Sequence, residues 1–260
     1  MDAVLLFSGQ GAQKVGMGKD LYDQYPVAKA LIEQADKALG ESLSAVMFEG
    51  PGEELTRTCN CQPALYVHGL ACLAVLKELV PTLNPVAAAG LSLGEFTAHA
   101  AAGTYSFEEG LRLVQKRGAF MEEACNATKG TMAAMIGGTD ENVIKLAQEC
   151  DVDVANFNCP GQTVVSGTEE GVAKAVAGAK AAGCKIAKKL NVAGAYHSRL
   201  MHSAMVKLAE ELKNISFGTP SMPVYCNYEA RVVEGPDDIR SMLEHQVCGS
   251  VRWTASMQKL

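Results

Sequence analysis

Residues 86–96 have the sequence VAAAGLSLGEF, and this stretch decides how the fold is interpreted. The apolar run 86–89 has the length of a short buried strand, and the residues after Gly94 have the composition of a helix. Between them lies G-x-S-x-G, the nucleophile-elbow pattern, with Ser92 flanked by Gly90 and Gly94. Side chains at the two glycine positions would collide with neighbouring backbone. The pattern predicts a serine hydroxyl held clear of a sheet at the N-terminus of a helix.

That position suits a nucleophile. The helix dipole and the N–H of Leu93 can stabilise an oxyanion that forms beside Ser92. The alternative interpretation is a glycine-rich turn in which Ser92 only caps the helix. The preceding strand and the following helix supply the context that the catalytic motif requires, and they favour a nucleophile.

A nucleophilic serine needs a general base, for which the chain offers five histidines. His197 lies at a junction between structural units, just before a helix that opens at Ser198, and such loops often carry chemistry. The other four lie on helices or near the last residue: His68, His99, His202 and His245. We therefore favour His197 as the base.

A Ser-His-Asp hydrolase of the usual chain order would place its acid between Ser92 and His197. The aspartates in that interval are Asp140, Asp151 and Asp153, and all three fall within residues 129–189, where we expect an inserted subdomain. None of them follows a strand of the main sheet. A Ser-His dyad whose imidazole is oriented by a backbone carbonyl fits the sequence better.

Composition excludes several other classes. The 260 residues are 48% hydrophobic and 20% charged, with a net charge of −6 and dispersed Lys and Arg, so no basic stripe for nucleic acid is present. Nine cysteines show no zinc or CxxC spacing, which favours free thiols. Residues 63–80 carry His68, Lys77 and Glu78 and are too short for a membrane span. We expect a buried core helix there, with Pro63 in its first turn.

The order of elements predicts an α/β fold. Strands at 4–7 and 86–89 alternate with helices at 22–39 (broken near Pro26), 63–80 and 95–102, which is typical of a parallel, hydrolase-like sheet. From residue 131 the pattern becomes βαββαβ, with Asp140 as the expected cap of its first helix. We expect a ferredoxin-like subdomain at 129–189, inserted into a catalytic subdomain of 1–128 and 190–260. A helix at 198–215 and a short strand at 223–227 follow.

Seven motifs occur in a fixed order along the chain: FSGQGAQ at 7–13, QPA at 62–64, GLSLGE at 90–95, QKRGAFM at 115–121, NFNCPGQ at 156–162, VAGAYHS at 192–198 and QVCGSVRW at 246–253. In these motifs the chain resembles the malonyl-CoA:acyl carrier protein transacylases of plastid and bacterial type II fatty-acid synthesis. These enzymes load malonyl groups, and related loaders serve polyketide synthesis. The resemblance extends over nearly all 260 residues.

The resemblance implies a role for each matching residue. Ser92 would be the acylated nucleophile and His197 its general base, steadied by a main-chain carbonyl near Gln246. The backbone N–H groups of Gln10 and Leu93 would form the oxyanion hole.

Other matching residues would bind substrate. Arg117 would hold the free malonyl carboxylate, which a planar guanidinium can bind through two hydrogen bonds. Gln62, Asn158 and Gln162 match positions that line the site, although buried polar residues also serve simply to satisfy backbone groups. The segment GAYH, with Tyr196 before the histidine, resembles malonyl-type rather than methylmalonyl-type loaders. The ring of Tyr196 would crowd the α-methyl group of a methylmalonyl substrate.

The implied reaction is a ping-pong transfer from malonyl-CoA to the phosphopantetheine thiol of acyl carrier protein. Coenzyme A enters as a thioester substrate, and no metal or redox cofactor is required. Carrier proteins of this pathway are acidic, so we expect a basic docking patch built from Lys180, Lys185, Lys188, Lys189, Lys116 and Arg112. Solvated surface lysines are the alternative. We expect a monomer without nucleic-acid or membrane partners, in the cytoplasm of a bacterium or the plastid stroma of an alga or plant.

Two departures from the family pattern stand out. Leu91 occupies the position before the serine where many bacterial members have His. Plastid-type members resemble this chain at that position. Family members also usually continue past VRW with a helix and a strand that ends in a glycine-proline-glycine turn, so we expect the core sheet to lack an element. Two rival functions stay open: a serine thioesterase or esterase, and a non-catalytic carrier-docking domain of a larger synthase.

Overall fold

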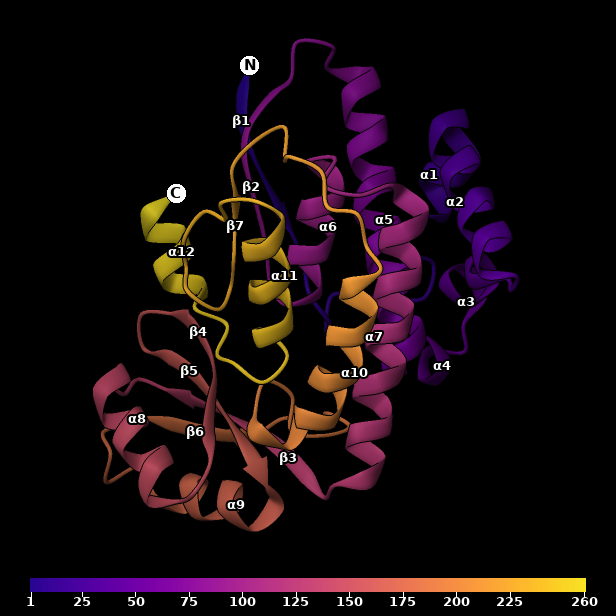
Figure 1. Ribbon diagram of the computed structural model, residues 1–260. Coiled ribbons are helices and arrows are strands. Elements are labelled where there is room, and N and C mark those ends of the chain that lie inside the picture. Colours follow the sequence, from indigo (N-terminus) through magenta and orange to yellow (C-terminus); the bar gives the residue numbers. More distant parts are fainter. The chain divides into compact units, whose positions relative to one another are not determined.

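The computed structural model describes residues 1–260. The chain divides into two compact units. The first comprises Met1–Ala119, Glu211–Tyr225 and Val232–Ile239, and the second comprises Phe120–Glu210, Cys226–Arg231 and Arg240–Leu260. Each unit contains one sheet, as Figure 1 shows. The predicted α/β class, with a parallel sheet and a separate antiparallel sheet, is confirmed.

The sheet of the first unit is parallel. Its strands are β1 (Asp2–Phe7), β2 (Asn84–Gly90) and β7 (Val224–Tyr225), in the order β1-β2-β7. Phe7 pairs with Gly90, so the turns that follow β1 and β2 leave the same edge of the sheet. Ligand sites of open parallel sheets form at this carboxyl edge.

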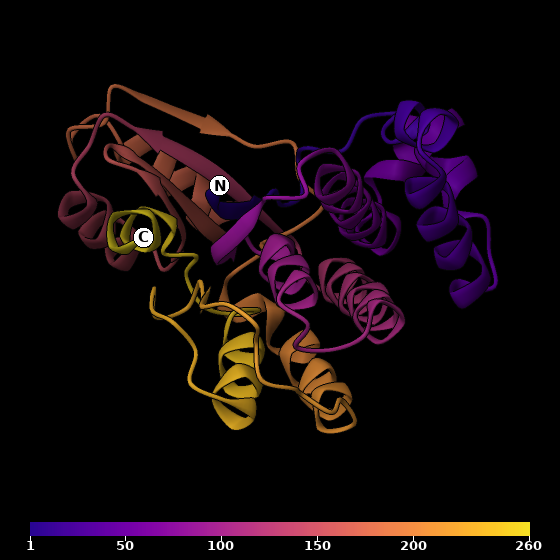
Figure 2. The ribbon, with the colours of Figure 1, turned by 90° about the horizontal axis from the view of Figure 1, so that it is seen from above.

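Six helices lie wholly in the first unit: α1 (Lys19–Gln24), α2 (Pro26–Leu39), α3 (Leu43–Glu49), α4 (Gly52–Thr56), α5 (Thr58–Leu79) and α6 (Leu93–Ala101). The helix predicted for 22–39 breaks where expected, because Tyr25 takes an extended conformation before Pro26. α2 packs on the outer side of α5, as the indigo and purple ribbons of Figure 2 show, and α5 packs on α6.

The core helix α5 begins earlier than the sequence predicts. It starts at Thr58, with Cys61 donating its N–H to the carbonyl of Arg57 at 2.7 Å, so Pro63 lies inside the helix rather than in its first turn. Pro63 lacks an N–H and removes one helical hydrogen bond. Thr58–Leu79 is the one helix long and apolar enough to cross a membrane, and 56% of its most apolar 18-residue stretch is buried. Burial of this kind is typical of the predicted core helix of a globular domain.

The sheet of the second unit is antiparallel. It contains β3 (Gly130–Ile136), β4 (Asp153–Cys159), β5 (Gln162–Thr168) and β6 (Ile186–Lys189) in the order β4-β5-β3-β6. With α8 (Asp140–Glu149) and α9 (Glu169–Gly178) the chain order is the predicted βαββαβ. The boundaries predicted for this subdomain follow the sheet, whereas the compact unit also includes residues 120–128, 190–210, 226–231 and 240–260.

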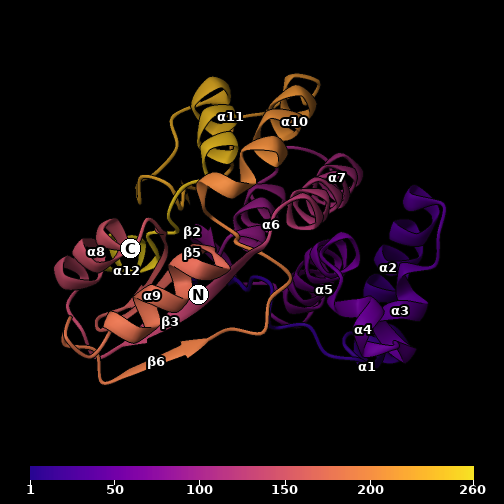
Figure 3. The same ribbon diagram turned by 90° about the horizontal axis from the view of Figure 1, so that it is seen from below.

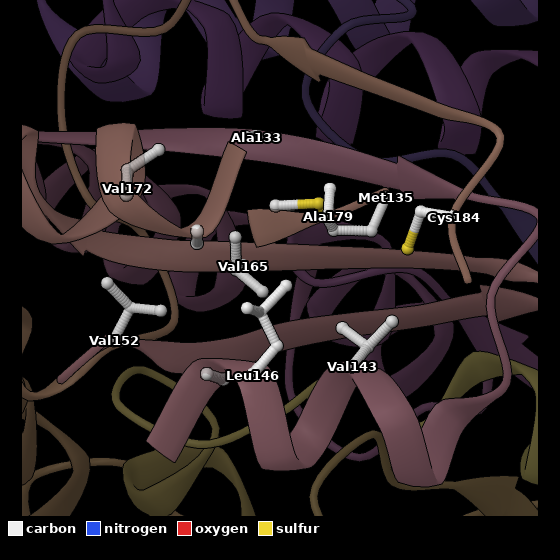
Figure 4. Close-up of a cluster of buried hydrophobic side chains, with 11 residues drawn as sticks. Ala133, Met135, Val143, Leu146, Val152, Val165, Val172, Ala179 and Cys184 are labelled. Carbon is white, nitrogen blue, oxygen red and sulfur yellow. The ribbon is translucent and has the colours of Figure 1, made fainter. Parts of the chain in front are cut away.

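Helices α8 and α9 cover one face of this sheet (Figure 3). Figure 4 shows Val143 and Leu146 of α8 directed at the sheet, where they join Met135 and Val165 in a buried apolar cluster. Side chains of a strand alternate between faces, so Ala133 and Met135 of β3 both contribute to this cluster.

Two helix starts differ from prediction. Thr139, not Asp140, caps α8, because the Thr139 hydroxyl accepts the N–H of Asn142 while Asp140 lies in the first turn. The helix expected at 198–215 consists of a 3₁₀ turn at Arg199–Met201 followed by α10 (His202–Lys213). Ser198 caps the 3₁₀ turn, where its hydroxyl accepts the N–H of Leu200 at 3.2 Å.

The remaining helices are α7 (Phe107–Ala127), α11 (Pro236–His245) and α12 (Trp253–Lys259). The chain passes from one compact unit to the other within α7, α10 and α11.

Candidate active site

The elbow predicted at Ser92 is present in the first unit. β2 ends at Gly90, α6 begins at Leu93, and Ser92 lies between them with φ 54° and ψ −104°. A positive φ strains any residue with a Cβ, and such strain is common where a nucleophile is presented. The Ser92 side chain makes no capping hydrogen bond to α6. The geometry therefore favours the nucleophile over the capping serine.

Two glycines make this turn possible. A Cβ at Gly90 would overlap the carbonyl group of Gly94 and lie 2.6 Å from the nitrogen of Glu95. A Cβ at Gly94 would overlap the carbonyl oxygen of Phe7 and lie 2.9 Å from that of Ser8. All of these atoms are backbone, which cannot move aside as a flexible side chain could.

The predicted oxyanion-hole donors follow neighbouring strands. Leu93 is the first residue of α6, where N–H groups have no acceptor within the helix. Gln10 follows β1 in the adjacent turn. The two turns are in close contact, because a Cβ at Gly9 would collide with the carbonyl oxygen of Leu91. The parallel pairing of β1 and β2 thus brings both predicted donors to one edge of the sheet.

Arg117 lies directly beside the serine. Its guanidinium donates from Nη2 to Ser92 Oγ at 3.1 Å and from Nη1 to Gln62 Oε1 at 2.6 Å. Arg117 and Gln62 are each only 1% exposed. The guanidinium also lies 5.0 Å from the centroid of the Phe96 ring, a cation–π distance. A fixed positive charge is therefore held at the hydroxyl of Ser92.

Close approach of two helices puts Arg117 there. A Cβ at Gly118 would lie 2.5 Å from the carbonyl oxygen of Thr58 and 3.0 Å from the Cα of Cys59, so only glycine lets α7 pack this tightly on the start of α5. Sequence reasoning missed both Gly118 and Phe96. The signal for Gly118 was a glycine inside a long helix, which commonly marks a close helix contact.

His197 belongs to the second unit, where it is 5% exposed. Its Nδ1 lies 2.9 Å from the carbonyl oxygen of Gln246, which is fully buried. A carbonyl can only accept, so Nδ1 carries the proton and Nε2 presents a lone pair. The hydrogen bond to a backbone carbonyl that was predicted to orient the imidazole is therefore present within this unit.

The loop that carries His197 is tightly held. His197 has φ 55°, a strained value for a residue with a side chain. The hydroxyl of Ser198 donates to the carbonyl of Ala195 at 2.6 Å. The loop also packs on its neighbours through Gly194, where a Cβ would collide with the thiol of Cys125. These contacts hold His197 in its strained conformation.

The other four histidines have different surroundings. His99 is fully buried, with Nδ1 3.2 Å from Thr104 Oγ1, and burial lowers its pKa to about 3. His68 is half-buried in α5, where burial lowers its pKa. His202 and His245 are exposed.

The predicted binding residues divide between the units. Asn158 and Gln162 lie at the ends of β4 and β5, on either side of the Pro160–Gly161 turn, and both are half-buried. Neither side chain makes a hydrogen bond within the chain. Tyr196 is 7% exposed and immediately precedes His197. The structure brings Ser92, Arg117 and Gln62 together in one unit, and His197 and Gln246 together in the other.

No group of three or more His, Cys, Asp or Glu side chains is arranged to hold a metal ion, and all nine cysteines are free thiols. Four of these thiols are buried: Cys61, Cys125, Cys184 and Cys226.

Comparison with known proteins identifies the family. Residues 4–259 match the model of the acyl transferase domain. The "Malonyl CoA-acyl carrier protein transacylase" of Bacillus subtilis is 44% identical over 260 residues, which cover 98% of this chain and 81% of that protein.

Solved structures agree. The malonyl CoA-acyl carrier protein transacylase of Coxiella burnetii superposes with a TM-score of 0.95 at 35% identity. The match covers 98% of this chain and 82% of the Coxiella burnetii chain. A type II polyketide malonyl-transacylase, solved in complex with its acyl-carrier protein, superposes with a TM-score of 0.94 at 36% identity, covering 98% of this chain and 84% of its own. The chain thus spans about four-fifths of the proteins that it matches, and it belongs to the acyl transferase family, among the malonyl CoA-acyl carrier protein transacylases.

Proposed function

We propose that this protein transfers a malonyl group from malonyl-CoA to the phosphopantetheine thiol of an acyl carrier protein, through an ester on Ser92. The relatives named above carry this activity in their names. The observation that carries the proposal for this chain is the 3.1 Å contact between Arg117 Nη2 and Ser92 Oγ in a buried setting. A serine esterase has no need of a buried cation at its nucleophile, whereas a malonyl thioester brings a carboxylate that must be neutralised.

The first half-reaction forms the ester. His197 takes the proton of Ser92 through Nε2, and Ser92 Oγ bonds to the thioester carbon of malonyl-CoA. The N–H groups of Gln10 and Leu93 stabilise the oxyanion of the tetrahedral intermediate. When the carbon–sulfur bond breaks, the imidazolium returns the proton to the sulfur of coenzyme A.

The second half-reaction reverses these roles. His197 takes the proton of the carrier thiol, the sulfur attacks the malonyl ester, and the proton returns to Ser92 as the ester bond breaks. Arg117 holds the malonyl carboxylate through both steps, and Gln62 supports its guanidinium. Water that attacks the ester would release malonate, so exclusion of water decides between transfer and hydrolysis. All of these steps use protein groups and the coenzyme A thioester, without a metal or redox cofactor.

We assign carrier docking to lysines of β6 and the turn before it. Lys180, Lys185 and Lys188 are exposed and make no ion pair with the acidic residues of this chain. Lys189, by contrast, pairs with Glu169 at 3.6 Å. Ile186, between these lysines, is 56% exposed and offers an apolar contact. An acidic carrier would find positive charge around an apolar anchor on this surface.

The two other residues of the expected patch fit it less well. Lys116 pairs with Glu211 at 2.6 Å and Arg112 pairs with Glu108 at 3.3 Å, both in the first unit. We therefore restrict the docking surface to β6 and the turn before it. The relatives named with an organism are bacterial, which favours the cytoplasm over the plastid for this reaction.

Intact mass after brief mixing with malonyl-CoA tests the proposal, with acetyl-CoA and Ser92→Ala as controls. We expect a malonyl adduct on the parent protein only, discharged when a carrier thiol is added. Free malonate formed without carrier, at the rate of adduct turnover, would identify a hydrolase instead. Carrier binding without any adduct would identify a non-catalytic docking domain.

A further inference from the structure

The carbonyl of Gln246 belongs to a turn that directly follows α11. Gln246 still donates its N–H to the helix, to the carbonyl of Met242 at 3.0 Å. Its own carbonyl is one of those that a helix leaves without an internal donor at its C-terminus. Gly249 closes the turn by donating its N–H to the carbonyl of His245 at 2.9 Å. The position of the acceptor for His197 therefore depends on the turn at residues 245–249.

The ring of Tyr228 contacts both ends of this turn. It stacks on the ring of His245 with the centroids 5.4 Å apart and an angle of 26° between the planes. At the other end, a Cβ at position 249 would overlap ring carbon Cδ2 of Tyr228, so the ring lies directly on the backbone of Gly249. The ring thus bridges the two residues that the closing hydrogen bond joins.

Tyr228 is itself anchored to the sheet of the second unit. Its carbonyl accepts from Arg252 Nε at 2.9 Å, and the neighbouring carbonyl of Asn227 accepts from the backbone N–H of Arg252 at 2.9 Å. The adjoining Val251 donates to the carbonyl of Ala155 in β4 at 2.8 Å. The backbone of Tyr228 is therefore linked through Arg252 and Val251 to β4, while its ring contacts the 245–249 turn.

We propose that Tyr228 is a positioning residue for the general base: its ring, held between His245 and Gly249, keeps the 245–249 turn closed and the Gln246 carbonyl on His197 Nδ1. This role rests on the proposed function, in which His197 acts as the base. Tyr228 touches no reacting atom and acts only through the turn.

Loss of the brace has a defined chemical consequence. The Gln246 carbonyl keeps the proton on Nδ1 and stabilises the imidazolium that forms when Ser92 is deprotonated. If the turn opens, part of the His197 population shifts to the other tautomer, and its protonated form loses an acceptor. The rate should fall and the acid limb of the pH–rate profile should move to lower pH, with the KM for malonyl-CoA little changed.

The experiment compares Tyr228→Ala, Tyr228→Phe and the parent protein. Nitrogen-15 NMR of labelled histidine reports the His197 tautomer, assigned with His197→Gln, and steady-state kinetics report kcat and KM. Tyr228→Ala should populate both tautomers and lower kcat about tenfold, the value of one hydrogen bond. Tyr228→Phe should behave as the parent, because the ring carbons make the contacts.

Two further variants separate positioning from general damage. Phe120→Ala removes another half-buried aromatic ring of the same unit, whose contact is with Lys207, and should leave the tautomer unchanged. Gly249→Ala keeps the tyrosine at position 228, but the added methyl group displaces its ring from the turn. This variant should therefore shift the His197 tautomer as Tyr228→Ala does. This variant also serves if Tyr228→Ala does not fold.

The readouts distinguish the two proposals. A parent tautomer and parent kcat in Tyr228→Ala would overturn the positioning role, as would an equal effect from Phe120→Ala. A tautomer shift in a protein whose parent forms no malonyl-serine would support the positioning role and refute the proposed function.

Discussion

Arg117 donates a hydrogen bond to Ser92 across 25 positions of sequence. The contact joins the middle of α7 to the elbow before α6 and places Nη2 of the guanidinium 3.1 Å from Ser92 Oγ. Gln62 and the ring of Phe96 hold the same guanidinium from other directions, so its position is set before substrate arrives. A preorganised cation is worth more in such a buried site than in water.

Arg117→Ala should change which acyl group is accepted. Without the guanidinium the malonyl carboxylate loses a charge-assisted pair of hydrogen bonds, so kcat/KM for malonyl-CoA should fall about 100-fold or more. Acetyl-CoA has no carboxylate, and its slower acylation should change far less. Stopped-flow acylation with both thioesters measures the ratio, and an equal loss for both would remove carboxylate recognition from the role of Arg117.

His197→Gln should prevent efficient formation of the malonyl-serine. Glutamine cannot act as a base, and general-base catalysis is commonly worth about 10²- to 10⁴-fold. Intact mass after a short reaction should show adduct on the parent and almost none on the variant. The matched control is His202→Gln, an exposed histidine five positions on, which should acylate normally.

Gly90→Ala should abolish stable folding. The added methyl group would overlap backbone atoms of Gly94 that cannot shift without breaking the elbow, so we expect a loss of more than about 4 kcal/mol of unfolding free energy. Gly52→Ala is the control, because its nearest neighbour would be 3.8 Å away and α4 favours alanine. Urea titration followed by circular dichroism measures both. A folded Gly90→Ala protein would contradict the elbow geometry.

His99 should make stability depend on pH. Burial lowers its pKa from 6.5 to about 3, so between those values the unfolded chain binds a proton that the native protein does not. The free energy of unfolding therefore falls as pH falls below about 6.5, by up to about 1.4 kcal/mol per pH unit. Urea titrations of the parent and His99→Gln at pH 7.5 and 5 should show this loss only in the parent. A difference between the two proteins that does not change with pH would exclude the effect.

Lys188→Glu should weaken carrier docking alone. Lys188 is exposed on β6, and charge reversal should raise the KM for carrier several-fold while acylation from malonyl-CoA keeps its rate. The increase should shrink at high salt because exposed charges are screened. Lys145→Glu, on α8, is the matched control. A KM for carrier that stays at the parent value would move the docking surface elsewhere.

Local patterns in the sequence were enough to predict most of the fold. The G-x-S-x-G spacing was enough to predict the elbow, since only glycine fits where Gly90 and Gly94 meet backbone. The spacing of apolar residues was enough to predict the βαββαβ order from β3 to β6. Apolar residues repeat every two residues in a strand and about every 3.6 in a helix, and each segment shows its own repeat without reference to the rest of the chain. Element boundaries were less accurate: α5 begins at Thr58 and α8 is capped by Thr139, and both depend on which donor reaches which acceptor.

By itself the sequence determined the class of fold, the elbow serine and the types of residue available for acyl transfer. Only the tertiary structure decided which of them meet. Arg117 reaches Ser92 because Gly118 lets α7 pack closely on α5, and His197 is oriented by a carbonyl 49 positions away. Turns and periods arise from neighbours in the chain, whereas these contacts arise from the packing of distant helices, which no local pattern encodes.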